Sequence, residues 1–215
     1  MGFSYFNHLL VVALPREFTL IFHQLAPIAV ILLILTSTGM LFFRDWRLVL
    51  AFFAIQYIGV LILVGNSLPF GLAGIKLVVG WMAAVALGTT QVGQNSLVEE
   101  QGQYTNRIFR LLAVSLIIIL CYSISPKVII WLPGVSLPVV FGSLVLIATG
   151  LLQLGVTIQS FRVIIGLLAI LAGFEILYAV VEPSVLVTGL LAAINLGLAL
   201  VGSFFLSSNA LEKPA

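Results

Sequence analysis

Long apolar runs separated by short polar segments dominate this chain. Each run has about 18 to 22 residues, the length at which an α-helix crosses the hydrocarbon core of a bilayer. The runs cover residues 24–43, 48–65, 70–90, 111–130, 138–158, 163–181 and 185–206. The pattern therefore predicts an all-α, polytopic membrane protein with about seven transmembrane helices.

The composition strengthens this prediction. Hydrophobic residues make up 62% of the chain and charged residues 7%, with a mean hydropathy of +1.28, whereas charged residues form about a quarter of a soluble domain. A soluble fold is excluded, and the lipid bilayer is the expected surrounding. The 9 basic and 7 acidic residues are too few for a nucleic-acid-binding surface. Any chemistry is therefore expected between the helices.

The first 23 residues do not resemble a removable secretory signal. No basic segment precedes their apolar stretch, and Pro15, Arg16 and Glu17 interrupt it. The stretch 3–14 is too short to span a bilayer, so we expect residues 1–23 to form an interfacial segment.

Few residues could serve metal or redox chemistry. Cys121 is the single cysteine, which excludes an intramolecular disulfide and a cysteine-based cluster. His8 and His23 have no partner at metal-ligand spacing. We therefore expect no cofactor and no metal ion.

The basic residues predict an orientation. With seven crossings and the N-terminus outside, the cytoplasmic side carries Arg44, Arg47, Arg107, Arg110, Arg162 and Lys213. The outer side carries only Arg16 and Lys127. This asymmetry follows the positive-inside rule and predicts a cytoplasmic tail at 207–215. The expected location is a prokaryotic plasma membrane or a thylakoid membrane.

An internal repeat emerges when Arg47 is laid over Arg162. RLVLAFFAIQ then matches RVIIGLLAIL, and GIKLVVGWMAAVALG matches GLLAAINLGLALVGS. Two such units point the same way across the membrane only if an odd number of spans separates them. We therefore predict parallel three-helix repeats at 24–90 and 138–206, joined by a cytoplasmic loop and one linker helix within 91–137.

Two ionisable residues lie well inside the apolar runs. Lys76 follows the outer boundary by about 9 Å, and Glu175 lies at a matching depth, about 20 Å along its helix from the cytoplasmic side. An ion pair or proton exchange is possible if the third and sixth spans adjoin. Alternatively, Lys76 snorkels to the outer headgroups, and Glu175 is a protonated, hydrogen-bonded structural carboxyl.

Uncharged polar residues and glycines also occur within the spans. Gln56, Thr149, Gln153 and Asn195 either extend a polar track or form ordinary interhelical hydrogen bonds. Small residues are expected to allow close helix packing, namely Gly74, Gly80, Gly166, Gly173, Gly189 and Gly197.

The second unit resembles a known family. The run TGLLQLGVTIQSFRVIIGLLAILAGFEIL, followed by AAINLGLALVGSFFL, is similar to the small three-helix subunit of respiratory complex I, called chain 4L or subunit K. It is also similar to the C subunit of multisubunit cation/proton antiporters. A chain of this length with such a unit after additional helices resembles component E of hydrogenase-4-type membrane complexes.

The family pattern has a basic residue after the first helix and a buried glutamate in each of the next two. Arg162 and Glu175 match the first two positions, whereas Ala193 stands at the third. In the first unit, Val60 and Val78 occupy both acidic positions. The resemblance implies a non-redox membrane subunit, with antiporter-like and complex-I-like partners, that contributes Glu175 to proton translocation as a relay.

Two other functions are compatible with the same residues. In a structural or assembly subunit, Lys76 and Glu175 would pair only to set the helix register. A stand-alone transporter with parallel repeats would bind a solute near the midplane. Few polar groups are available for such a solute, and neither unit has a broken helix at that level.

Overall fold

The computed structural model describes residues 16–92, 107–132, 134–182 and 184–211. This part of the chain contains seven helices and no strand. The helices are α2 (Arg16–Phe42), α3 (Trp46–Val64), α4 (Phe70–Val92), α5 (Arg107–Trp131), α6 (Leu137–Val156), α7 (Ser160–Val181) and α8 (Val185–Leu211). All seven are long and apolar enough to cross a membrane, which confirms the predicted fold class. The chain is an integral membrane protein.

The first and last helices are longer than the spans predicted from the sequence. α2 begins at Arg16, so residues 16–23 of the expected interfacial segment are helical and continuous with the first span. Residues 1–15 lie outside the described part of the chain. At the other end α8 continues to Leu211, into the predicted tail.

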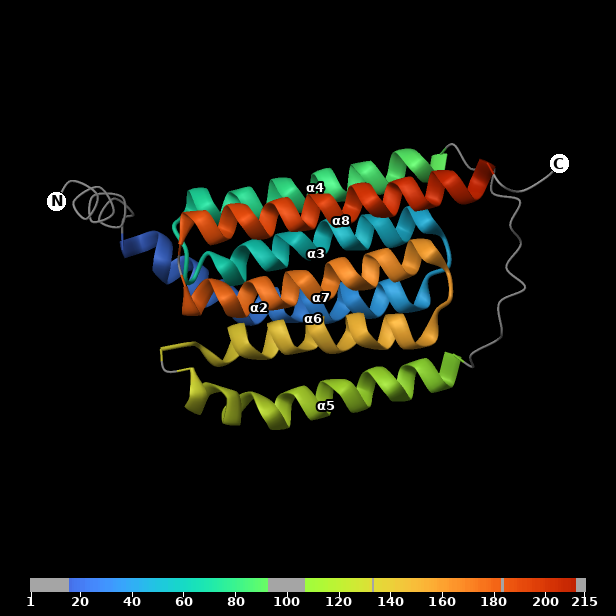
Figure 1. The fold of residues 1–215 in the computed structure, drawn as a ribbon. Helices are drawn as coiled ribbons and strands as arrows, with labels where there is room; N and C mark the ends of the chain where they lie inside the picture. Colours follow the sequence, from blue (N-terminus) through green and yellow to red (C-terminus); the bar gives the residue numbers. More distant parts are fainter. Residues whose placement is uncertain (1–15, 93–106, 133, 183, 212–215) are drawn as a thin grey trace.

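The helices form two rows of three, with α5 at the edge (Figure 1). α2, α3 and α4 form one row, and α6, α7 and α8 form the other. Each helix of the first row packs on its counterpart in the second, α2 on α6, α3 on α7 and α4 on α8. Counterparts run in the same direction across the bundle. The assignment of the two rows as repeats stays a prediction from the sequence.

The edge helix α5 packs mainly against α6. Val114, Cys121 and Ser125 are buried on this side, at helical spacing, and most of the other side chains of α5 are exposed. α5 thus crosses the bundle once more along its flank. This crossing returns the chain to the face at which α2 began, so that α6 can run parallel to α2.

Short connections end the helices and fix their alternating directions. Asp45 accepts a hydrogen bond from the backbone N–H of Arg47, at 3.3 Å, and so caps the start of α3. Pro138 lies in the first turn of α6, where a backbone N–H has no partner within the helix, so the missing N–H of proline costs no hydrogen bond.

The two ends of the bundle are named after the two ends of α4. The Phe70 face is the end at which α4 begins, and the Val92 face is the opposite end.

The contact between α6 and α7 is the most extensive in the bundle. A Cβ atom at Gly173 would lie 2.8 Å from the carbonyl oxygen of Ser143, and one at Gly150 would lie 2.8 Å from that of Gly166. Because these neighbours are backbone atoms, the two helices approach this closely only with glycine at both positions.

The expectation that six glycines allow close packing is correct for half of them. Close neighbours surround Gly80, Gly166 and Gly173. In contrast, no described atom beyond the glycine's own stretch of helix lies within 4 Å of a Cβ built at Gly74, Gly189 or Gly197. The prediction was wrong for these three because they lie on the outward sides of α4 and α8.

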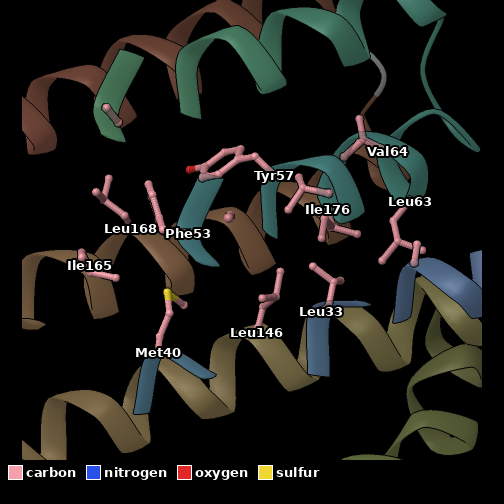
Figure 2. Packing of buried hydrophobic residues seen from close by; sticks show 14 of the residues in the cluster. Leu33, Met40, Phe53, Tyr57, Leu63, Val64, Leu146, Ile165, Leu168 and Ile176 are labelled. Carbon is pink, nitrogen blue, oxygen red and sulfur yellow. The ribbon is translucent and has the colours of Figure 1, made fainter. Parts of the chain in front are cut away.

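An apolar core fills the space between α2, α3, α6 and α7 (Figure 2). Leu33 and Met40 enter from α2, and Leu146 from α6, while Phe53 and Ile176 face them from α3 and α7. Inside a bilayer such side chains gain little by leaving lipid, so close van der Waals contact is the main stabilising term. This core holds α3 and α7 in fixed register, and both helices contribute to the site described next.

Candidate functional site

Lys76 and Glu175 form a buried ion pair. The Nζ atom of Lys76 lies 3.1 Å from Oε1 of Glu175, and the two side chains are 2% and 0% exposed. Lys76 therefore turns into the bundle rather than snorkelling to the nearer face. The charges cancel at the site, which reduces the cost of holding either one inside the membrane.

The pair joins two helices that do not pack side by side. α3 contacts α4, α4 contacts α8, α8 contacts α7, and α7 contacts α3, so these four helices form a closed ring. Lys76 from α4 and Glu175 from α7 meet across this ring. One charge thus comes from each row of helices.

The pair lies nearer to the Phe70 face than to the Val92 face. Lys76 follows the start of α4 by six residues and Glu175 precedes the end of α7 by six, or about 9 Å in each case at 1.5 Å per residue. Along α4, Lys76 is about 24 Å from the Val92 face.

A hydrogen bond crosses the same ring between the other two helices. The side-chain N–H of Asn195 on α8 donates to the hydroxyl oxygen of Tyr57 on α3, at 2.9 Å, and both side chains are fully buried. The Tyr57 ring packs so closely against Gly80 that a Cβ atom at position 80 would overlap it. Tyr57 is also close enough to Glu175 for the two groups to interact electrostatically.

Sequence reasoning missed Tyr57. The available signal was a phenol in the middle of a span, next to Gln56. That signal is weak, because only the fold brings Asn195, 138 residues away in sequence, within reach of the hydroxyl.

Several polar atoms around the ring are buried and have no hydrogen-bond partner among the described residues. They include Oε2 of Glu175, Oδ1 of Asn195 and both amide atoms of Gln56. The Nζ atom of Lys76 and Oε1 of Glu175 also have no hydrogen-bond partner there and interact only as an ion pair. Such atoms are costly in an apolar interior, and these lie on three of the four ring helices. They are the groups to which a proton, water or cation would bind.

The four residues of the predicted polar track do not come together. Asn195 belongs to the ring, and Gln56 is buried on α3. Thr149 donates to the carbonyl of Val145 in its own helix, at 2.7 Å. Gln153 donates to the backbone carbonyl of Arg162, at 2.9 Å, and so ties α6 to the start of α7. Thr149 thus bonds within α6, and Gln153 forms an ordinary interhelical hydrogen bond.

The ring is mostly apolar between Asn195 and the Val92 face. The buried residues of its four helices there include Phe53, Ala83, Leu87, Leu168, Ala199 and Leu206. Among the described residues of this half, only Arg162 and Ser203 are buried polar side chains. Most of the buried polar side chains of the ring therefore lie between Asn195 and the Phe70 face.

Two arginines bind the end of α2. Arg162 donates to the carbonyl oxygens of Met40, at 3.1 Å, and Phe43, at 2.7 Å. Arg110 donates to the carbonyl of Leu41, at 2.8 Å. The last carbonyls of a helix have no partner within it and carry partial negative charge, so these contacts cap α2. Sequence reasoning assigned both arginines to orientation, and Arg162 also to the basic position of the family pattern, but it did not predict that they cap α2.

We expect replacement of Arg162 to destabilise the protein, whereas replacement of Arg47, its counterpart in the predicted repeat, should not. Arg162 is 7% exposed, and Arg162→Met removes its bonds to α2, at a cost of about 3 kcal/mol. Arg47 is exposed and lies over the ring of Trp46, so Arg47→Met should stay within about 0.5 kcal/mol of the wild type. Thermal unfolding in detergent measures both, and equal losses would contradict the capping role.

Among the described residues, no group of three or more histidine, cysteine, aspartate or glutamate side chains is placed to hold a metal ion. Comparisons with protein-family models, with curated proteins and with solved structures found no match to this chain. The structure shows an integral membrane protein in which a buried ion pair links the two rows of helices.

Proposed function

We propose that this chain is a membrane subunit of a complex-I-related proton pump or of a multisubunit cation/proton antiporter, in which Glu175 takes up and releases protons. The observation that carries the proposal is the buried Lys76–Glu175 pair, held across a ring of helices from both rows. Intramembrane ionisable residues are rare and commonly mark ion or proton paths. The resemblance of the second unit to subunit K points to the same class of complex.

The pair couples protonation to helix position. A proton on Glu175 removes the negative charge that compensates Lys76, which leaves a buried ammonium without its counter-charge. This state is relieved if Lys76 moves away or loses its own proton. Because the two residues lie on α4 and α7, a shift between these helices in a larger assembly would change how readily Glu175 binds a proton.

A complete path across the membrane needs groups from neighbouring subunits. The half of the ring toward the Val92 face offers few polar side chains. Ala193, which stands where the family pattern has its second carboxylate, is exposed on α8. A partner subunit could therefore supply the missing acid from outside this bundle.

Glu175→Gln tests the proposal in native membranes. We expect proton translocation by the assembled complex to fall by at least about tenfold, because the amide cannot exchange a proton. Quenching of a pH-sensitive dye in everted membrane vesicles measures translocation. Glu182→Gln is the matched control, because Glu182 is an exposed carboxylate at the end of α7.

Purification in mild detergent establishes that the variant complex is intact. Antiporter-like or complex-I-like subunits should copurify equally with the wild type and with Glu175→Gln. Undiminished translocation by Glu175→Gln would reduce the pair to a structural tie that supports assembly. Isolation of the wild-type chain as a monomer would contradict the proposed class of complex.

A further inference from the structure

Glu175 has its counter-ion within the same chain. The Lys76 ammonium lies 3.1 Å from one carboxylate oxygen, and both residues are almost fully buried. No other charged side chain of the described residues is buried in the half of the ring nearer to the Phe70 face. The site is therefore neutral without any bound ion.

The ring that encloses this pair also carries oxygen atoms of the kind that bind hard cations. Glu175 has a second carboxylate oxygen, and Asn195 a carbonyl oxygen, that lack a hydrogen-bond partner in the described part of the chain. The Tyr57 hydroxyl oxygen lies 2.9 Å from the amide nitrogen of Asn195. Carboxylate, carbonyl and hydroxyl oxygens suit alkali-metal ions as they suit other hard cations.

We infer that Lys76 is a tethered cation in a latent monovalent-cation site, and that it restricts the wild-type site to protons. The inference rests on the proposed function and names the ion that the site exchanges. A free Na⁺ ion competes poorly with an ammonium that is covalently held beside the carboxylate. A proton does not need the position that the ammonium occupies, because it binds directly to a carboxylate oxygen.

Removal of Lys76 should expose the site. In Lys76→Ala the buried carboxylate loses its only nearby positive charge, and an uncompensated charge in an apolar interior is strongly unfavourable. The carboxylate must then bind either a proton or a metal cation. Truncation of the long lysine side chain also leaves space between α4 and α7 for a small ion.

Thermal unfolding of the purified full-length protein tests this without measuring transport. Each protein is heated in detergent with NaCl or with an equal concentration of choline chloride, at mildly alkaline pH, so that protons compete weakly. The wild type should unfold at the same temperature in both salts. Lys76→Ala should gain about 3–6 °C in NaCl when Na⁺ is at about ten times its dissociation constant.

Matched variants assign the effect to this site. Lys127→Ala removes an exposed lysine of α5 and should behave as the wild type. Lys76→Ala combined with Glu175→Gln should lose the Na⁺ effect, because no carboxylate remains. If Lys76→Ala does not yield folded protein, Lys76→Met, which keeps more of the side-chain volume, replaces it.

Three outcomes would overturn the inference: stabilisation of the wild type by Na⁺, no Na⁺ effect in a folded Lys76 variant, or the same effect in the double variant. These outcomes are separate from the proposed function, which depends on proton translocation by the Glu175→Gln complex. Failure of that translocation test would leave the Na⁺ measurement valid as a property of the isolated chain.

Discussion

Reversal of either charge in the buried pair should abolish folding, and reversal of both should restore it. Lys76→Glu places two carboxylates together inside the ring, and Glu175→Lys places two ammonium groups there. Each change leaves a buried charge without its partner and adds a like charge, at a cost of at least about 3–5 kcal/mol. A cost of this size is a large fraction of the stability of a typical domain.

The double variant should recover because the two positions have the same depth and meet in the ring. Size-exclusion profiles in detergent and thermal unfolding report the recovery. Lys127→Glu is a matched control, because Lys127 is exposed on α5, and it should leave the profile unchanged. Single reversals that fold as well as the wild type would show that the pair does not hold α4 to α7.

The second large effect is expected where α6 and α7 approach most closely. Gly173→Ala brings a Cβ to 2.8 Å from a backbone carbonyl oxygen on α6, and backbone atoms cannot move aside cheaply. We expect a loss of about 1–3 kcal/mol from overpacking. Gly173→Leu should prevent the two helices from docking, with loss of folded protein.

Gly189→Ala on α8 is expected to stabilise the protein, in contrast to Gly173→Ala. No described atom beyond its own stretch of helix lies within 4 Å of a Cβ built there, and alanine is favoured over glycine within a helix by about 0.5–1 kcal/mol. Thermal unfolding of the two alanine variants compares them directly. A loss at Gly189 as large as that at Gly173 would mean that helix flexibility, not contact between α6 and α7, sets the effect.

The sequence could predict the spans and the charged pair for simple physical reasons. A helix that crosses a bilayer has a minimum apolar length, so polar residues such as Asp45 and Glu182 mark the boundaries. A buried charge is costly, so Lys76 and Glu175 stood out among apolar neighbours. Their contact could not be predicted, because it depends on a ring of helices that no local pattern encodes.

Other features depend on three-dimensional partners alone. Tyr57 has its hydrogen-bond partner on α8, far away in the sequence. Arg162 looked like a residue that sets orientation, but it reaches the end of α2. Whether a glycine such as Gly189 serves packing depends on which side of its helix faces a neighbour, and apolar residues on all sides of a membrane helix hide that side.

The unequal depth of the ion pair affects how the membrane potential would act on it. A proton that moves between Glu175 and the Val92 face crosses about three quarters of the bundle, on the basis of the position of Lys76 along α4. If the potential falls evenly, this movement involves about 1.7 kcal/mol per 100 mV, against about 0.6 kcal/mol for movement to the Phe70 face. Release toward the Val92 face would therefore be the more voltage-sensitive step, and exchange with the Phe70 face would respond to voltage about a third as strongly.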